Sequence, residues 1–386
     1  VSFSSPSVAS ARKCVAKHVL FAKKKKKKSG ATAGVKGFGT SSKKEDGVTM
    51  DRSKDTLNFY DYMEKNGAGD NLKKCALGYF TLMPSGFQLR GIAALRDIKK
   101  GDVIMRIPYE MAVNLGPEGE DPTLPGLELL KDYCETHSGD GERVPYFKLL
   151  PPFMGDDCLG STDFFSNEAL DMLQAPLIVE ETISRRERTK SHFDEVAANL
   201  PPWTDGTNMT EEQLRWAVWL ITSRVLTVQG DPDEGRSYRL LIPFLDMCNH
   251  DRASPHILTG RAMPGGELKV VAGENVAAGD QINICYGGGV AGNDRFIQDY
   301  GFLDRNVAAF DIVAQQLLGK RRVTEGASAG KNIALADMER ELERLRETHM
   351  EQDAQLLETA TDEQIRSAIE YRLGLKRALS KYMIMT

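Results

Sequence analysis

The most informative stretch of this sequence is Asp246-Met247-Cys248-Asn249-His250, read together with Tyr286-Gly287 further along the chain. The first stretch closes an apolar run from Leu240 to Met247, which we predict to be a buried strand that ends at Asn-His. Tyr286 closes a second apolar run, Gln281 to Tyr286, which we predict to be another strand. Both strand ends therefore present polar or aromatic side chains.

A short helix is predicted to follow from Asn293 and to carry Asp299-Tyr300-Gly301-Phe302 at its end. The strand ends and this helix end thus supply an amide, an imidazole and two phenols. No strong base and no nucleophilic serine or cysteine with partners stands near them in the sequence. Such groups suit a reaction in which a cofactor supplies the chemistry and the protein supplies alignment and dipoles, and they are poorly suited to hydrolysis.

These residues resemble those of the SET-domain protein methyltransferases, in particular the branch typified by the plant Rubisco large-subunit lysine methyltransferase. The resemblance covers most of residues 55–382, and its elements stand in family order. They are Gly91-Ile92-Ala93-Ala94-Leu95-Arg96-Asp97-Ile98, Lys100-Gly101-Asp102, Ile107-Pro108, Pro145-Tyr146-Phe147-Lys148-Leu149-Leu150-Pro151, Arg215-Trp216-Ala217-Val218, Ser223-Arg224, Ile242-Pro243 and Ala278-Gly279-Asp280-Gln281-Ile282. Each motif is weak alone, but their common order is specific. The resemblance implies methyl transfer from S-adenosylmethionine to a protein lysine.

The resemblance also implies a role for each residue of the site. It makes Tyr286 and Tyr300 catalytic, and it places Asp246, Tyr300 and Phe302 along the substrate channel. The implied cofactor-binding residues are Leu89, Arg90, Arg224, Asp246, Asn249, His250 and Tyr286. The loop that begins at Gln88 lacks the acidic residue and one glycine of the family pattern, so backbone contacts to the cofactor are expected there rather than a contact from the Gln88 side chain.

Most of these residues also have an ordinary structural interpretation. Tyr286 could cap a core at a strand edge, and Tyr300 and Phe302 could pack behind a helix that ends at a glycine. The Asn-His pair could be a turn asparagine beside a core histidine. Arg224 could be a solvated surface residue, and Asp246 could anchor its loop.

One motif favours a different class of enzyme. Gly287-Gly288-Gly289-Val290-Ala291-Gly292 fits G-x-G-x-x-G, and Asp311 stands near the acidic position of a dinucleotide-binding oxidoreductase. The helix from Asn293 is predicted to be too short to connect parallel strands, and alternating βαβ units are missing around it. We therefore interpret the glycine run as a mobile loop over the substrate channel.

The length and composition fit a globular protein of two or three domains, with 41% hydrophobic and 27% charged residues. The patterns predict a leader at 1–50 and an α+β fold. The resemblance implies that this fold consists of a β-rich SET domain at 51–305 with a helical insertion at about 120–230, and a helical substrate-docking domain at 306–386. Expected elements include a helix at 56–66, strands at 77–83, 88–95 and 102–107, a basic helix at 182–200, a helix that opens at Thr210, and helices around 335–345 and 362–382.

Charge is unevenly distributed along the chain. The net charge is -5, yet residues 1–44 contain no Asp or Glu and include a lysine run at 23–28. A basic, serine-rich, acid-free leader is typical of an organelle transit peptide, which predicts a plastid protein. A nuclear signal or nucleic-acid-binding tail is the alternative, which would place the protein in the nucleus or cytoplasm.

The sequence supports neither a metal site nor a membrane span, and we expect no nucleic-acid partner. The six cysteines form no C-x-x-C pair, which argues against a zinc site. No apolar run is long enough to span a membrane. The expected partner is a protein substrate such as the Rubisco large subunit, aldolase or another protein. Two alternatives remain: the histidine-methylating branch of the family, in which the position of Tyr300 is not aromatic, and a non-catalytic SET-like binding module.

Overall fold

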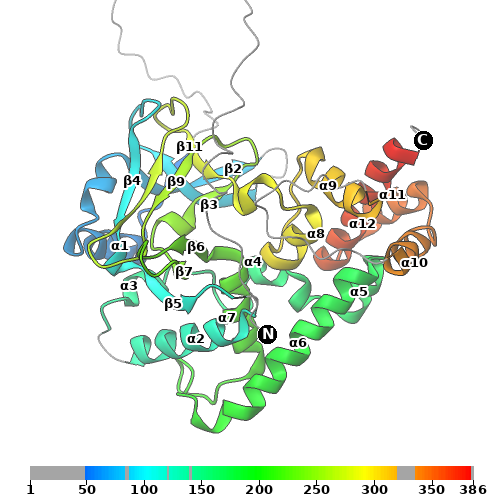
Figure 1. Cartoon of the computed structure of the whole chain (residues 1–386), viewed down its shortest axis with the longest axis horizontal. Helices are drawn as coiled ribbons and strands as arrows, with labels where there is room; N and C mark the ends of the chain where they lie inside the picture. The colour runs from blue at the N-terminus through cyan, green and yellow to red at the C-terminus, as the bar shows by residue number, and fades with distance from the viewer. Residues whose placement is uncertain (1–47, 83–86, 120, 139–140, 320–334, 384–386) are drawn as a thin grey trace, which may run out of the picture. The chain divides into compact units, whose positions relative to one another are not determined.

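The computed structural model describes residues 48–82, 87–119, 121–138, 141–319 and 335–383 (Figure 1). Within these ranges strands and helices occupy separate stretches of the chain, so the predicted α+β class is confirmed. The predicted leader lies outside the described residues, apart from its last three positions. Among the described residues, no helix is both long and apolar enough to cross a membrane.

The main sheet has five strands in the order β1-β2-β3-β11-β8. Their bounds are Thr49–Met50, Cys75–Leu82, Phe87–Ala94, Gln281–Ile284 and Asn249–His250, respectively. β2 and β3 confirm the strands predicted at 77–83 and 88–95, and the structure shows that they pair antiparallel. β11 pairs antiparallel with β3 and parallel with the two-residue strand β8, so Asn249 lies opposite Asn283. This sheet therefore joins the two sequence segments that carry the predicted site.

Two three-stranded sheets complete the β structure. One has the order β4-β10-β9, with bounds Val103–Pro108, Glu267–Val271 and Ile257–Gly260. The other has the order β5-β7-β6, with bounds Val113–Pro117, Ser237–Leu241 and Leu226–Gln229. In each sheet one pairing is local and the other, β4 with β10 or β5 with β7, joins segments more than a hundred positions apart, so the β region forms only when distant segments meet.

The prediction of a continuous strand from Leu240 to Met247 is wrong. β7 ends at Leu241, and the short 3-10 helix η5 (Leu245–Met247) follows. Pro243 has no N–H to donate to a sheet, and Phe244 adopts a positive φ of 71°, which a strand does not allow. The apolar character of the run reflects burial rather than strand structure, and Asn-His forms its own strand.

The strand predicted to end at Tyr286 stops at Ile284 instead. Tyr286 begins the 3-10 turn η6 (Tyr286–Gly289), in which Gly287 and Gly288 have φ near +60°. These glycines allow the chain to reverse directly after the tyrosine. α8 (Asn293–Arg295) and the π-helical turn η7 (Phe296–Tyr300) come next, and Gly301 ends that turn in the left-handed conformation, as predicted.

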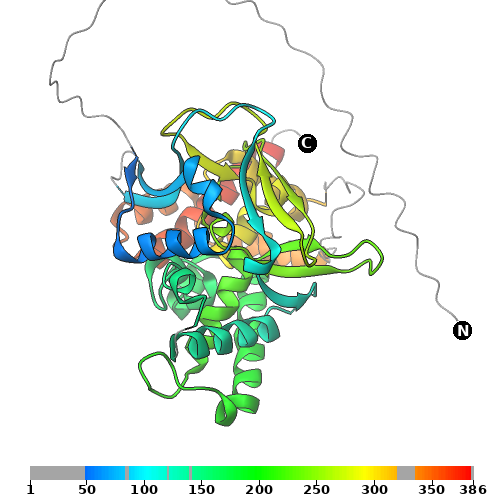
Figure 2. The ribbon, with the colours of Figure 1, turned by 90° about the vertical axis from the view of Figure 1, so that its left-hand side faces the viewer.

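Helices lie between β5 and β6 in sequence and together occupy one side of the sheets (Figures 1 and 2). They are α2 (Thr123–Ser138), α3 (Val144–Phe147), α4 (Asp156–Leu159), η3 (Thr162–Phe164), α5 (Asn167–Met172), α6 (Pro176–Val196), η4 (Ala197–Asn199) and α7 (Glu211–Arg224). α6 begins earlier than the predicted 182–200 helix because a proline is accepted at its first turn. α7 opens on the predicted Thr210 cap, which forms a capping box with Gln213.

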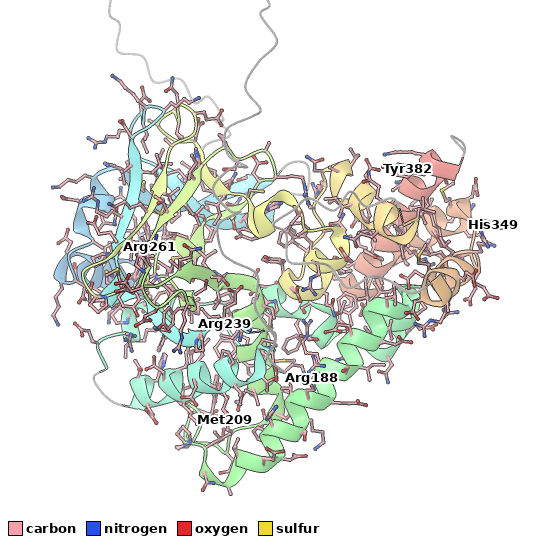
Figure 3. The ribbon with its side chains drawn as sticks, in the orientation of Figure 1. Arg188, Met209, Arg239, Arg261, His349 and Tyr382 are labelled. Atoms are coloured by element: carbon pink, nitrogen blue, oxygen red, sulfur yellow. The ribbon has the colours of Figure 1, made fainter. Side chains whose placement is uncertain are left out.

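The remaining helices lie at the two ends of the described chain. α1 (Lys54–Lys65) and the short 3-10 helices η1 (Gly69–Lys73) and η2 (Tyr109–Met111) belong to the N-terminal region. The C-terminal helices are α9 (Val307–Leu317), α10 (Leu335–Leu345), α11 (Met350–Thr359) and α12 (Glu363–Met383). α9, α10 and α12 share a second hydrophobic core with α5 and α6, and α11 packs against α12. Tyr382 of α12, labelled in Figure 3, accepts a hydrogen bond from Gln315 of α9.

Candidate active site

A pocket of about 150 Å³ lies where α7, η5, β11, η6 and η7 meet. Its walls combine aromatic, apolar and charged groups with backbone. They are Ser223, Arg224, Val225, Leu226, Leu245, Asp246, Cys248, Leu258, Ile284, Cys285, Tyr286, Gly287, Gly288 and Tyr300. Four of the predicted site residues thus line one cavity, although they come from segments far apart in sequence.

Two tyrosines form one wall of this pocket. The rings of Tyr286 and Tyr300 stack with centroids 5.1 Å apart and an angle of 23° between their planes. The Tyr286 hydroxyl donates a hydrogen bond to the carbonyl oxygen of Cys248, 2.5 Å away. Desolvation raises the pKa of Tyr286 well above its usual value and raises that of Tyr300 to about 12. Both side chains are therefore neutral phenols at physiological pH.

His250 holds the backbone at the start of η6. Its Nδ1 accepts a hydrogen bond from the main-chain N–H of Tyr286 at 3.0 Å, and its Nε2 lies 3.4 Å from Oδ2 of Asp304. Nε2 must then carry the proton that faces the carboxylate. Desolvation lowers the pKa of His250, which keeps the ring neutral. The histidine acts here as a rigid connector between strands.

Asp246 is a buried carboxylate at the pocket wall. Its Oδ2 accepts a hydrogen bond from the Tyr146 hydroxyl at 3.0 Å and lies 3.7 Å from Nη1 of Arg224. Arg224 also donates to the main-chain oxygen of Asp246 at 2.9 Å. Oδ1 has no hydrogen-bond partner among the described residues. Desolvation raises the pKa of this carboxyl group to about 6.

Asn249 links the short strand β8 to β3. Its side-chain amide donates to the carbonyl oxygen of Arg90 at 2.8 Å. The guanidinium group of Arg90 hydrogen-bonds the carbonyl of Leu149, and Leu89 pairs with Phe80 in the β2–β3 hairpin. The structure therefore places the Arg90 carbonyl, but not its charged group, beside Asn249.

Several buried polar atoms close to these residues lack hydrogen-bond partners within the described chain. They are Nε of Arg224, Oδ1 of Asp246, Nε2 of Gln281 and Oδ1 of Asn283. Buried polar atoms are rarely left unpaired unless a ligand or water satisfies them. A ligand that carries a carboxylate and an ammonium group would satisfy donors and acceptors of these kinds. The residues present therefore fit an amino-acid-bearing cofactor such as S-adenosylmethionine.

The aromatic wall continues behind Tyr300. Phe296 lies 5.3 Å from the Tyr300 ring and 5.2 Å from the Phe302 ring, measured between centroids. Phe302 is 38% exposed and is not among the residues that line the pocket. It supports the channel residues from outside, and its ring is the part of this wall most open to solvent.

The glycine run is arranged differently from a dinucleotide-binding loop. It is followed by the three-residue helix α8, and the strand before it runs antiparallel to its neighbour β3. The guanidinium group of Arg252 hydrogen-bonds the carbonyls of Gly289 and Ala291 and attaches the run to the segment after β8. This geometry excludes the oxidoreductase interpretation.

Sequence reasoning assigned no role to several groups at the site. Tyr146 stood in a quoted motif, but its partner Asp246 lies a hundred positions away. Arg252 and Asp304, which form an ion pair at 2.7 Å beside His250, belonged to no motif. Within the described ranges, no cluster of three or more His, Cys, Asp or Glu residues is placed to hold a metal ion.

The SET domain family model matches residues 89–287, which is more than half of the 386-residue chain. The chain therefore belongs to the SET-domain family, as the motifs indicated. Among curated relatives, the actin-histidine N-methyltransferases of Rattus norvegicus and Homo sapiens are 28% identical to it over 240 residues. That match covers 56% of this chain and only 38% of each relative.

Solved structures of similar fold include the SET domain of LSMT bound to lysine and AdoHcy, with a TM-score of 0.58. Another is Rubisco LSMT bound to AdoMet, with a TM-score of 0.56. Both are 18% identical to this chain, and each match covers 86% of this chain and 91% of the other. At this identity the similarity shows the fold, and it confirms the predicted Rubisco methyltransferase type of fold.

Proposed function

We propose that this protein is an S-adenosylmethionine-dependent methyltransferase that modifies a lysine side chain of a protein substrate. Membership in the SET-domain family and the shared fold with proteins that hold AdoMet or AdoHcy support the cofactor. The observation that carries the proposal is the stacked pair Tyr286 and Tyr300 in a pocket closed by the Cys248 backbone. We call the narrow opening beside these two rings the aromatic sleeve. It fits a slim nucleophile, such as a lysine amine, that must be aligned and desolvated.

The residues that would hold the cofactor follow from the unpaired polar atoms. Nε of Arg224 would bind the carboxylate of the cofactor. Asn249 and the backbone of Leu89 and Arg90 would bind other polar groups of the cofactor. When bound, the cofactor supplies a methyl group activated by a cationic sulfur. The protein contributes alignment, exclusion of water and fixed dipoles.

Tyr286 orients the reaction through its hydroxyl oxygen. Because this hydroxyl donates its proton to the Cys248 carbonyl, its lone pairs remain free toward the pocket. They can accept weak C–H···O hydrogen bonds from a polarised methyl group. The neutral phenol keeps this role across the physiological pH range, since its pKa is raised.

Asp246 and the aromatic wall act on the incoming amine. The free oxygen of the Asp246 carboxylate attracts a lysine ammonium group to the pocket, while the tyrosine rings exclude the water that stabilises its charge. Transfer requires the neutral amine, so the aromatic enclosure favours loss of its proton.

Histidine methylation is the second candidate, because the curated relatives are actin-histidine methyltransferases. An imidazole ring is wider than a lysine chain and already largely neutral at physiological pH. It gains little from a narrow aromatic sleeve, whereas the Tyr286–Tyr300 stack restricts the width available. This restriction favours lysine.

Labelled S-adenosylmethionine tests the function directly. The purified protein would be incubated with the labelled cofactor and a plastid extract, and the labelled peptide would then be mapped. We expect the label on lysine; label on histidine would replace the lysine assignment and retain the family. Calorimetry would accompany the assay: binding of S-adenosylmethionine and not of NAD is expected. Cofactor binding without transfer to any protein would identify a binding module instead of an enzyme.

The partner and location are also part of this proposal. The Rubisco large subunit and aldolase are the first proteins to test, because the sequence resembles methyltransferases of that branch. The acid-free leader supports a plastid location. Extract from another compartment serves as the control for the labelling experiment.

A further inference from the structure

Tyr300 is the last residue of the π-helical turn η7, and this turn ends abruptly. Gly301 adopts φ 85°, and its N–H donates to the carbonyl of Phe296 at 2.9 Å. The carbonyl groups nearest a helix end have no intrahelical partner. The carbonyls of Gln298 and Asp299, immediately before Tyr300, therefore need donors from elsewhere.

The helical insertion supplies these donors. The Ser161 hydroxyl donates to the Gln298 carbonyl at 2.7 Å, and Nη2 of Arg185 donates to the same oxygen at 3.0 Å. The Thr222 hydroxyl donates to the Asp299 carbonyl at 3.2 Å. All three donors come from outside the SET-type sheets, so the turn that carries Tyr300 is fixed by the insertion.

Arg185 makes the most extensive of these contacts. Its Nη1 lies 2.7 Å from Oδ1 of Asp299, and its Nε lies 2.9 Å from Oδ2 of Asp163. The residue is only 4% exposed, so this guanidinium group joins two carboxylates and one carbonyl away from solvent. Burial alone would lower the pKa of Arg185, but the two carboxylates raise it and the side chain stays charged.

Close backbone packing strengthens the same connection. A Cβ atom added to Gly160 would come within 2.2 Å of the carbonyl oxygen of Gly301. The loop before η3 and the residue after Tyr300 are thus in direct contact, and neither can shift without the other. The position of the aromatic wall therefore depends on the position of the helical insertion.

We propose that Arg185 is a positioning residue that sets the place of the Tyr300 ring in the pocket. Resting on the proposed function, this inference gives the helical insertion a part in the reaction: it holds one wall of the substrate channel at the distance that Tyr286 requires. Arg185 touches neither the pocket nor any reacting group, and it acts through Gln298 and Asp299.

Arg186 provides a matched control on the same helix. It hydrogen-bonds the carbonyls of Thr162, Asp163 and Phe165, so it also holds the insertion together. It makes no hydrogen bond to η7 in the described structure. A general loss of packing in the insertion would therefore follow from changes at either arginine, whereas displacement of Tyr300 would follow only from changes at Arg185.

The test compares Arg185→Lys with Arg186→Lys in the full chain. A lysine keeps the charge between Asp163 and Asp299 but lacks the planar fork that also reaches the Gln298 carbonyl. We expect kcat to fall about 10- to 100-fold in Arg185→Lys, with the affinity for S-adenosylmethionine unchanged. Hydrogen–deuterium exchange at residues 297–301 should become faster. Arg186→Lys should leave both kcat and this exchange as in the wild type.

Equal kcat and exchange in wild type and Arg185→Lys would overturn the inference, as would equal losses in the two variants. If Arg185→Lys does not fold, Ser161→Ala removes the other donor to the Gln298 carbonyl and should show the same effects more weakly. The exchange experiment needs no substrate. A wild-type protein that transfers no methyl group would therefore refute the proposed function, while the exchange data would still decide whether Arg185 fixes the turn.

Discussion

The main-chain N–H of Tyr286 donates a hydrogen bond to Nδ1 of His250 over 3.0 Å. This bond ties the strand that carries the Asn-His motif to the tyrosine of the pocket wall, in addition to the parallel pairing of β8 with β11. Residues predicted to contact the cofactor and residues predicted to contact the substrate therefore share one backbone framework.

Tyr286→Phe removes the hydroxyl and retains the ring. The cofactor affinity should stay within about twofold, while turnover should fall about 100-fold or more, because the hydroxyl acts on the aligned methyl group in the transition state. Calorimetry and single-turnover kinetics would measure the two quantities. Unchanged turnover would reduce Tyr286 to a packing residue.

Tyr300→Ala removes one half of the stacked pair. The pocket should widen, lysine turnover should fall, and an imidazole should be admitted more readily. In the wild type the rate should rise with pH through the alkaline range, as the lysine amine loses its proton. Peptides that differ only in Lys or His at the target position provide the assay. A variant as active on lysine as the wild type would show that the aromatic sleeve has no catalytic importance.

Asp246→Asn should change how stability depends on pH. The pKa of this carboxyl group is raised from 3.8 to about 6 in the folded protein, so the folded state binds more protons than the unfolded state between these values. Stability contributed by Asp246 is therefore present at low pH and lost as pH rises through about 6. From pH 5 to pH 7, the wild type should lose about 1–2 kcal/mol of unfolding free energy relative to the variant.

Denaturant unfolding at the two pH values measures this difference. Desolvation lowers the pKa of His250, so the stability contributed by His250 changes with pH in the opposite direction. Because both proteins contain His250, this contribution cancels when their unfolding free energies are compared. A difference in unfolding free energy that does not vary with pH would show that Asp246 titrates normally.

Gly91→Ala tests the contact between β3 and the Asn-His strand. An added Cβ would lie 2.4 Å from Nε2 of Gln281 and 2.6 Å from Nδ2 of Asn249, so both amides must move. The bond from Asn249 to the Arg90 carbonyl would break, at a cost of about 1 kcal/mol. A loss of this size corresponds to about fivefold weaker binding of S-adenosylmethionine, which calorimetry would measure. Gly119→Ala, where an added Cβ would meet only Nη2 of Arg239 at an ordinary 3.8 Å, controls for the general effect of losing a glycine.

Removal of residues 1–46 tests the leader. Turnover and thermal stability should be unchanged in vitro, and import into the plastid should be lost. The cut must precede β1, because Thr49 and Met50 pair with Tyr79 and Gly78 in the main sheet. Plastid import of the truncated protein, or accumulation of the full-length protein in the nucleus, would contradict the transit-peptide assignment.

The sequence predicted the fold class, the strands β2 and β3, and the presence of Asp246, Tyr286 and Tyr300 in one site. These features depend on local patterns and on motif order, both of which are visible in a single chain. It did not predict that the apolar run after Leu241 leaves the sheet. Hydrophobicity reports burial, and burial looks the same in a strand and in the turn that Pro243 and Phe244 impose.

The network around Arg185 was also beyond prediction. Arg185 stands in a basic amphipathic helix, where an arginine is ordinarily solvated, and its partner Asp299 lies more than a hundred positions later. Local periodicity carries no information about such a pairing. The same holds for Tyr146 and Asp246, which meet only because α3 packs beneath η5 in the folded protein.

The order of strands in the main sheet determines when the site can form. β3 ends at Ala94, but its partner β11 begins only at Gln281. β4 is likewise far in sequence from its partner β10. Contacts between residues so far apart in sequence form slowly, because the chain must lose the conformational entropy of the intervening loop before the pairing can stabilise it. While the chain is being synthesised, the edge of β3 that pairs with β11 therefore stays open to pairing with other chains until the last third of the protein has emerged.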